Sequence, residues 1–273
     1  RLFAGKKPAC LVYGIDPGTS PDHESFYRLC AMLPLLLGSI GTEGGGVHVL
    51  GAAGNAQGAL DFGATAKYAP GLRPATSAAV RKHLSRLWGV EVAGKPGKNW
   101  PEIFASIEKG EIRGLVLIGL NPFELGYPRT RVEGALARLD FLLCQDALRT
   151  PALEYAHVTL PGATFVEKDG TATNCERRVQ PMVRSLESPG DARQDFDLLN
   201  SLLGLLHPGL EVPGRGAAFS QAAESMAELQ GLQIESLPVE GIQWPVSADG
   251  RGMERLLPPE EGKARFKFFP ARI

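Results

Sequence analysis

The sequence predicts an α/β protein built on parallel sheets, and three observations carry this prediction. Short apolar runs of strand length recur at 9–14, 114–119, 141–145 and 157–161. Segments with apolar residues at helical spacing alternate with these runs. The chain also contains 33 glycines and 21 prolines, which indicates many tight turns. Continuous apolar strands that alternate with helices are typical of a parallel sheet covered by helices on both faces.

The first part of the chain supplies a strand, helices and a glycine-rich stretch. A buried strand is expected at 9–14. Ser20 and Pro21 suit an N-cap and a first helical position, so a helix is expected from there to about Leu37, where Gly38 ends it. The glycine-rich stretch GSIGTEGGGVHVLGAAGNAQG follows at 38–58, and further helices are expected at 76–88 and 101–109.

The second part of the chain alternates regularly between strands and helices. The expected order is a strand at 114–119, a helix at 130–139, a strand at 141–145, a short helix at 150–156 and a strand at 157–161. An amphipathic helix is expected from Asp191 to Leu206. After Pro208 the pattern weakens, and one helix is expected near 219–229.

Charge and composition argue against several classes of function. The 29 basic residues are balanced by 30 acidic ones, so the chain lacks the basic excess that binding to nucleic acid or an anionic membrane requires. The longest apolar run, at 30–41, is too short to cross a bilayer. The four cysteines fit no zinc or iron–sulfur spacing, so we expect free thiols, a reducing compartment and no metal site: they are Cys10, Cys30, Cys144 and Cys175.

Three loops follow the carboxyl ends of the expected strands, where open parallel sheets bind their ligands. They are 119–127, 145–150 and 161–178. The third belongs to LPGATFVEKDGTATNCERRVQ, which runs from Leu160 and is expected to be an irregular loop. Two interpretations stay open for this loop: a solvated surface segment, or a binding segment whose small residues let the backbone approach a ligand.

The charges of the third loop also allow two roles. Arg177 and Arg178 could meet a phosphate group. We expect them instead to form a local ion-pair network that fixes the loop, because Glu167, Asp169 and Glu176 are close in the sequence.

Four segments of the sequence, taken in order, resemble segments of the molybdopterin oxidoreductase family. The resemblance covers about residues 9–205 and 241–266. The segments are LPLLLGSIGTEGGGVHVLGAAGNAQGALDFG from Leu33, LVLIGLNPFE from Leu115 together with DFLLCQDALRTPALEYAHVTLPGA from Asp140, LPGATFVEKDGTATNCERRVQ from Leu160, and EGKARF from Glu261.

The resemblance implies Rossmann-like domains with parallel sheets. Residues 1–46 would then be the C-terminal part of a first α/β domain, residues 47–205 a second one, and residues 206–273 a loosely ordered C-terminal extension. The family's two domains together hold a bis-pterin guanine dinucleotide cofactor.

Carried over by position, the resemblance also names cofactor-binding residues. An acidic side chain at a strand end is a suitable acceptor for the amine donors of a guanine, although capping the following helix is an equally good account of Asp146. The implied residues are Gly119, Asn121 and Pro122 in the first loop, and Gln145, Asp146 and Thr150 in the second.

Two departures from the family argue against metal chemistry in this piece. The family's cluster cysteines and its metal ligand lie upstream of the part that matches this chain. We therefore assign no catalytic residue and do not expect the piece to be catalytic alone. Formate dehydrogenases of the family also carry arginine, glycine and glutamine where this chain has Gly51, Ala52 and Ala53. The missing arginine is the cation that would orient an anionic substrate.

Three interpretations of function follow from the resemblance. The first is the large iron–sulfur subunit of bacterial NADH-quinone oxidoreductase, a scaffold for electron transfer without a working metal site and with 4Fe-4S clusters upstream. The alternative is a fragment of a molybdenum or tungsten formate dehydrogenase catalytic subunit that binds a bis-pterin guanine dinucleotide. The third is a binding module that keeps a nucleotide or pterin without chemistry.

The first interpretation sets the expected partners and cofactors. The partners are other subunits of a respiratory or dehydrogenase complex, without nucleic acid and without a membrane span in this chain. The expected location is cytoplasmic, peripheral to the inner membrane through those subunits. We expect no cofactor in this piece, because Gly51 and its neighbours offer no side-chain donor. Molybdopterin guanine dinucleotide stays an alternative, which a titration with GMP or GDP distinguishes.

Overall fold

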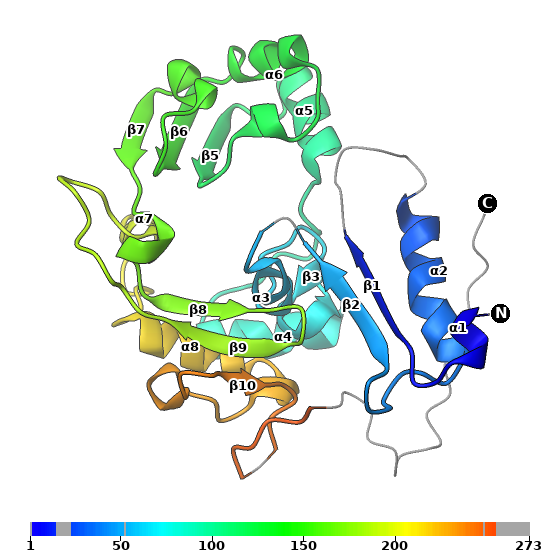
Figure 1. Ribbon diagram of the computed structural model, residues 1–273. Helices are drawn as coiled ribbons and strands as arrows, with labels where there is room; N and C mark the ends of the chain where they lie inside the picture. Colours follow the sequence, from blue (N-terminus) through cyan, green and yellow to red (C-terminus); the bar gives the residue numbers. More distant parts are fainter. Residues whose placement is uncertain (1, 15–22, 52, 248, 255–273) are drawn as a thin grey trace.

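The computed structural model describes residues 2–14, 23–51, 53–247 and 249–254, and it confirms the α/β architecture (Figure 1). The helices are α1 (Leu2–Gly5), α2 (His23–Leu36), α3 (Ala56–Asp61), α4 (Ala78–Trp88), α5 (Trp100–Glu108), α6 (Arg129–Leu136), α7 (Asp195–Leu206) and α8 (Arg215–Glu224). The strands are β1 (Cys10–Gly14), β2 (Gly46–Leu50), β3 (Tyr68–Ala69), β4 (Arg73–Pro74), β5 (Gly114–Ile118), β6 (Phe141–Asp146), β7 (Val158–Pro161), β8 (Gly170–Thr173), β9 (Arg178–Met182) and β10 (Ile242–Gln243).

The first parallel sheet joins β1 to β2, and α2 connects them. The strand expected at 9–14 is therefore confirmed as β1. The predicted cap, Ser20 with Pro21, lies outside the described residues, whereas the predicted end at Gly38 is confirmed by its left-handed φ of 67°. Within the glycine-rich stretch the sequence pattern did not predict β2. The run VHVL is compatible with a strand, since it begins with alternating apolar and polar residues. In the structure β2 pairs with β1 from Gly46 onward.

The second parallel sheet contains β5, β6 and β7 side by side in that order. All three strands were predicted, and so were the helices α5 and α6 that precede and follow β5. The short helix expected at 150–156 is a 3-10 helix, Pro151–Tyr155. The main core lies between this sheet and its helices, where Phe104, Leu136 and Leu142 are fully buried.

One face of this sheet differs from the prediction that both faces would be covered. Among the residues that point away from α5 and α6, Val116 is 47% exposed, Phe141 44% and Val158 38%, whereas Leu143 on the central strand is 7% exposed. Val116, Leu143 and Val158 stand next to one another across the three strands, so they share this face. Several apolar side chains of these strands are thus less buried by the described residues than the sequence pattern predicts.

The segment 161–178 is not an irregular loop, and this prediction was wrong. It contains β8 and leads into β9, which pair as an antiparallel hairpin from Thr173 and Val179 outward. Asn174 closes the hairpin turn, because its Oδ1 accepts hydrogen bonds from the backbone N–H groups of Glu176 (2.9 Å) and Arg178 (3.1 Å). An asparagine turn between β-branched residues indicates a hairpin. The sequence analysis missed it because it considered only the charged and polar residues of the segment.

The charges at the start of this segment tie the hairpin to neighbouring helices. Lys168 forms an ion pair with Asp195 at the start of α7, with Nζ 2.7 Å from Oδ2. Asp169 forms another with Arg215 at the start of α8, at 3.2 Å. Among the described residues, the local network expected around Arg177 and Arg178 is reduced to one ion pair, with Arg178 Nε 4.0 Å from Glu176 Oε2.

Described residues beyond 205 form a second core. α8 packs with β9 and β10, and the buried side chains of Val179, Phe219 and Leu229 lie between them. The helix expected near 219–229 starts earlier, as α8 at Arg215, and a 3-10 turn, Ala227–Leu229, follows it. The proposed boundaries at 46 and 205 stay predictions. The strand pair β1–β2 straddles the first of them, and β10 joins the hairpin from beyond the second.

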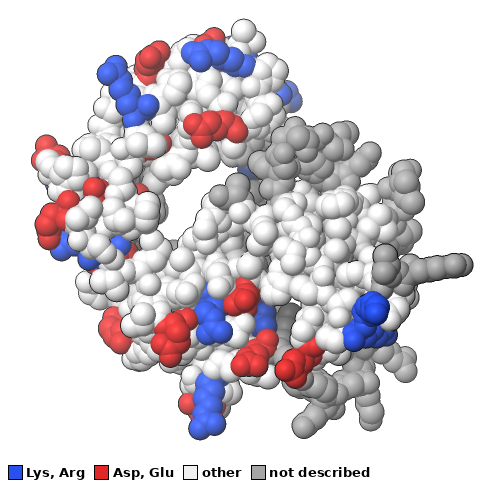
Figure 2. Space-filling model, in the orientation of Figure 1, with Lys and Arg blue, Asp and Glu red and all other residues white. Residues whose placement is uncertain are grey.

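The carboxyl ends of both parallel sheets face the same opening in the molecule. In Figure 1 the arrowheads of β5, β6 and β7 point down towards the middle of the view, and those of β1 and β2 point up towards it. The space-filling view shows that the surface is hollowed there (Figure 2). Because doubly wound sheets bind ligands beyond their carboxyl ends, this opening is where the fold places a ligand.

Candidate functional site

The carboxyl edge of β5–β6–β7 brings three of the predicted residues together. Gly119 directly follows β5, and Gln145 and Asp146 end β6. The Gly119 N–H donates a hydrogen bond of 2.8 Å to the Gln145 carbonyl oxygen, which joins the two strand ends. Gly119 has a left-handed φ of 59°, and the space where its Cβ would stand is open. Backbone at this edge can therefore lie close to a ligand.

Gln145 carries a buried acceptor that lacks a partner. The residue is 2% exposed, and its Nε2 donates to the Arg193 carbonyl oxygen at 2.9 Å. Its Oε1 accepts no hydrogen bond from the described residues. A buried polar atom left without a partner costs about 1–3 kcal/mol. An N–H donor of a ligand at this edge would remove that cost.

Asp146 lies beside Gln145 and is only partly buried. Its Oδ1 accepts a hydrogen bond of 2.9 Å from the Leu148 N–H, which forms a local turn. The 3-10 helix that follows begins after Thr150, so Asp146 does not cap it. A carboxylate next to an orphaned amide oxygen offers acceptors to adjacent N–H donors, as a guanine presents at its N1 and exocyclic N2.

The other predicted residues serve the shape of the loops. The Asn121 Oδ1 accepts from the Phe123 N–H at 3.3 Å, and its Nδ2 donates to Glu124 at 2.8 Å. Pro122 is buried at the start of a 3-10 turn. Thr150 stands before the next 3-10 helix without a capping hydrogen bond from its side chain. A direct role of these three in cofactor binding stays a prediction.

Cys144 lies one residue before Gln145 and is 3% exposed. Burial raises the pKa of its thiol to about 11, and the nearby Asp146 carboxylate adds to the shift. At pH 8 only about one thiol in a thousand is then ionised, and the thiolate is the reactive form. We therefore expect iodoacetamide to leave Cys144 unmodified in the folded chain and to modify the exposed Cys10. Peptide mass spectrometry checks this, and equal labelling of both would contradict the burial.

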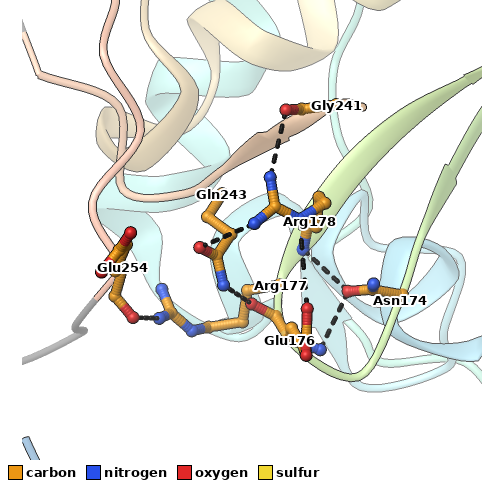
Figure 3. Close-up of polar contacts among 7 residues, drawn as sticks. All are labelled: Asn174, Glu176, Arg177, Arg178, Gly241, Gln243 and Glu254. Carbon is orange, nitrogen blue, oxygen red and sulfur yellow. Dashed lines mark hydrogen bonds and ion pairs between the residues drawn. The ribbon is translucent and has the colours of Figure 1, made fainter. Parts of the chain in front are cut away.

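A cavity of about 720 Å³ lies elsewhere, between the glycine turn at 40–46 and the tip of the β8–β9 hairpin. Its walls also include Gln243 in β10, Trp244 directly after it, and Glu254. Sequence reasoning missed Trp244, because 66 residues separate it from Arg178 in the chain. Figure 3 shows the polar contacts at the hairpin tip that form one wall.

The two arginines at the hairpin tip have different surroundings (Figure 3). Arg178 lies 4.0 Å from Glu176, beyond hydrogen-bonding distance, and it donates to Gln243 Oε1 at 3.1 Å and to the Gly241 carbonyl at 3.3 Å. Arg177 donates to the backbone carbonyls of Trp244 and Glu254. The two side chains thus fix the hairpin, as predicted. Backbone and amide oxygens serve as their partners in place of the expected carboxylates.

A buried network joins α3 to the same region. Asp61 is 4% exposed, and its carboxylate accepts hydrogen bonds from Gln57 Nε2 (2.7 Å) and Trp244 Nε1 (3.0 Å). Burial raises the pKa of Asp61, and these two hydrogen bonds oppose the rise. Asn55 adds a link to β8, because its Oδ1 accepts from the Thr173 N–H at 2.9 Å. The asparagine–glutamine–glycine segment therefore holds the hairpin in place.

Two further findings concern metal ligands and membrane-spanning helices among the described residues. No group of three or more His, Cys, Asp or Glu side chains within them could hold a metal ion. No helix within them is both long and apolar enough to cross a bilayer.

Comparison with known proteins identifies the family of the chain. The model of the family described as "Molybdopterin oxidoreductase" matches residues 3–204. The chain belongs to the molybdopterin oxidoreductase family. The mixed α/β fold with parallel sheets is the fold of such a domain, so the resemblance noted in the sequence is confirmed at the level of the family.

The relatives include two named formate dehydrogenases. The F420-dependent formate dehydrogenase 2 subunit alpha of Methanococcus maripaludis is 33% identical over 90% of this chain and 36% of its own length. The F420-dependent formate dehydrogenase subunit alpha of Methanocaldococcus jannaschii is 31% identical over 99% of this chain and 40% of its own length. The chain thus spans between a third and two fifths of these relatives.

Two further proteins complete the comparison. The NADPH-Fe(3+) oxidoreductase subunit alpha of Geobacter sulfurreducens is 29% identical over 82% of this chain and 26% of its own length. The solved structure of acetylene hydratase from Pelobacter acetylenicus aligns with a TM-score of 0.41 and 18% identity, over 58% of this chain and 23% of that one.

Proposed function

We propose that this chain is the cofactor-holding part of a formate-dehydrogenase-type alpha subunit. In this proposal the carboxyl edge of β5–β6–β7 receives the guanine end of a molybdopterin guanine dinucleotide. The observation that carries it is the buried, unpaired Oε1 of Gln145 beside the partly exposed carboxylate of Asp146. Both stand at the edge where doubly wound folds bind ligands.

The relatives support this choice over a subunit of NADH-quinone oxidoreductase. Proteins that are at least 31% identical over at least 90% of the chain carry the name formate dehydrogenase subunit alpha. Their names as alpha subunits support other subunits as partners, as was expected for a dehydrogenase complex. No observation on the described residues bears on a peripheral position at a membrane, which stays a proposal tied to those partners.

The residues at the edge have separate tasks in this proposal. Asp146 accepts from two adjacent N–H donors of guanine, and Gln145 Oε1 accepts from a third donor. Gly119, with its open Cβ position, lets the backbone lie close to the nucleotide. Gly162 lets the ends of β6 and β7 lie close together, because a Cβ there would be 3.1 Å from the Asp146 carbonyl carbon. When bound, the cofactor supplies the molybdenum or tungsten centre at which electrons are exchanged. The chain's own contribution is to hold and orient it.

A second candidate function is the scaffold first expected, a large subunit of NADH-quinone oxidoreductase without a working metal site. Gly51 and Ala53, at the end of β2, favour it, because neither has a side-chain donor or charge. In this candidate the opening between the sheets stays without a nucleotide, and the chain only supports clusters held elsewhere in the complex.

A thermal shift experiment separates the two candidates. GDP at 100 times its dissociation constant is expected to add about 2.7 kcal/mol to the free energy of unfolding. The melting temperature then rises by roughly 5–10 °C, because 1 kcal/mol shifts it by about 2–4 °C in a domain of this size. Asp146→Ala is expected to lower the rise to the value that ADP produces, because the substitution removes only the acceptor of the guanine donors.

The matched control lies just before the opposite end of β6. Asp140 precedes β6 and forms an exposed ion pair with Arg113, so Asp140→Asn is expected to keep the GDP-dependent rise. ADP serves as the base control, because adenine lacks the donor pair of guanine. If GDP does not change the melting temperature of the unchanged chain, the result favours the scaffold. An equal response to ADP would remove the role given to Asp146.

A further inference from the structure

We propose that the cavity between the glycine turn and the β8–β9 hairpin binds the phosphate group of a small ligand, with Arg177 as its main contact. The cavity runs along β2 from the glycine turn as far as Val49, whereas the proposed cofactor site lies at the carboxyl ends of β5 and β6 and shares no lining residue with it. It is therefore a separate site, and its test does not depend on the cofactor. Its volume of about 720 Å³ falls in the range of small-molecule pockets.

One wall of the cavity is backbone. Gly41 and Gly44 line it, and glycine has no side chain, so their lining atoms belong to the main chain. Both have left-handed φ values, 77° and 69°, as tight turns require. Among the described residues, the N–H groups of Ile40, Gly41 and Thr42 donate to no acceptor. Successive N–H groups in such turns form concave sites for anions.

The facing wall supplies a cation, Arg177, that interacts electrostatically with the buried Asp61 carboxylate without forming an ion pair with it. Within the described part of the chain, no ion pair joins Arg177 to a carboxylate, and its guanidinium bonds only the carbonyl oxygens of Trp244 and Glu254. Burial lowers the pKa of Arg177, which the charge of Asp61 opposes. A phosphate in the cavity would complete the set of partners, because the planar guanidinium matches two phosphate oxygens at once.

The position of Arg177 is fixed in advance of any ligand. Its guanidinium lies 5.3 Å from the ring centre of Trp244, and the Trp244 indole donates to the buried Asp61. Its backbone has a left-handed φ of 64°, which is uncommon for a residue other than glycine. Such backbone strain is commonly found at ligand sites. Arg177 is thus held by its neighbours, and it is one of the residues that line the cavity.

The other charges at the cavity are compatible with an anion. Arg178 adds a second cation, offset by Glu176 at 4.0 Å. The remaining carboxylates of the lining belong to Glu43 and Glu254, and both residues are exposed to solvent, where water screens their charge. His48 lines the wall as well. The half-buried arginines are therefore less exposed than these acidic side chains.

Isothermal titration of the full chain with pyrophosphate tests the proposal. Trp244 fluorescence gives a second reading, because the indole contacts Arg177. Arg177→Gln is expected to weaken pyrophosphate binding at least tenfold. Thr42→Glu places a negative charge on the exposed glycine turn and is expected to weaken it at least fivefold. Arg184→Gln, which loses only an exposed pair with Glu187, is expected to change the affinity by less than twofold.

The outcomes separate the alternatives. Absence of pyrophosphate binding to the unchanged chain overturns the proposal. Citrate bound as tightly as pyrophosphate overturns the assignment of a phosphate ligand in favour of a carboxylate. If Arg177→Gln does not fold, the Thr42→Glu result decides, and unchanged affinity there counts against the site. Asp146→Ala is expected to leave pyrophosphate binding here intact, so failure of the cofactor proposal and of this one are distinguishable.

Discussion

Phe104→Ala is expected to lower the free energy of unfolding by about 3–5 kcal/mol. Phe104 is 0% exposed in the core between α5, α6 and the sheet, and its ring meets Tyr127 edge-on with 5.0 Å between ring centres. Truncation removes buried apolar area and leaves a cavity that the close-packed neighbours cannot fill. Urea unfolding followed by far-UV circular dichroism measures the change in the midpoint and the slope.

The control for this substitution is a phenylalanine outside the core. Phe165 is 73% exposed, so Phe165→Ala is expected to change the free energy of unfolding by less than about 0.5 kcal/mol. Similar losses in the free energy of unfolding for the two variants would mean that the core around Phe104 does not stabilise the sheet β5–β6–β7. A Phe104→Leu variant, which keeps most of the volume, is expected to lose less than the alanine variant.

Gly63→Ala is expected to lower the free energy of unfolding by about 2–5 kcal/mol, the sum of a backbone and a steric contribution. Gly63 has a φ of 78°, which costs about 1–2 kcal/mol for a residue with a Cβ. A Cβ there would also lie 2.6 Å from the Pro70 nitrogen and 2.8 Å from the Ala69 carbonyl carbon. Both atoms are backbone, so the segments must separate, at about 1–3 kcal/mol.

Gly231 separates the two causes of that loss. Its φ of 83° is as unfavourable as that of Gly63, but a Cβ at this position meets nothing within 4 Å. Gly231→Ala is therefore expected to lose only the backbone contribution, about 1–2 kcal/mol. Equal losses at both glycines, measured by thermal unfolding, would show that the clash with Pro70 relaxes without cost.

The sequence alone predicted the sheet β5–β6–β7 and its helices α5 and α6 well, because the sequence patterns that indicate them are local. The runs at 114–119 and 141–145 are apolar for most of their length, and the helix at 101–109 follows Asn99, whose side chain closes a capping box with Glu102. The predicted end of α2 at Gly38 required only the left-handed tolerance of glycine. Such features depend on neighbours a few residues apart, so composition and spacing reveal them.

The hairpin β8–β9 was missed for the opposite reason. Its first strand has only small residues, charged residues flank it, and several partners of this segment come from far along the chain. Thr173 bonds Asn55, Lys168 pairs with Asp195, and Asp169 pairs with Arg215. No local sequence pattern indicates such contacts. The polar composition of the segment alone therefore led to the prediction of a loop.

The candidate site divides in the same way. The sequence by itself determined that Gly119, Gln145 and Asp146 lie at the carboxyl ends of two strands of one parallel sheet, because strand order and polarity follow from the alternating pattern and the resemblance. Only the tertiary structure decided that Gln145 Oε1 is buried without a partner, since its surroundings include Arg193 from a distant segment. It also decided that Trp244 and Arg177 meet at the cavity. Burial and unsatisfied hydrogen bonds arise from packing between segments distant in sequence, and this is why they became visible only in the fold.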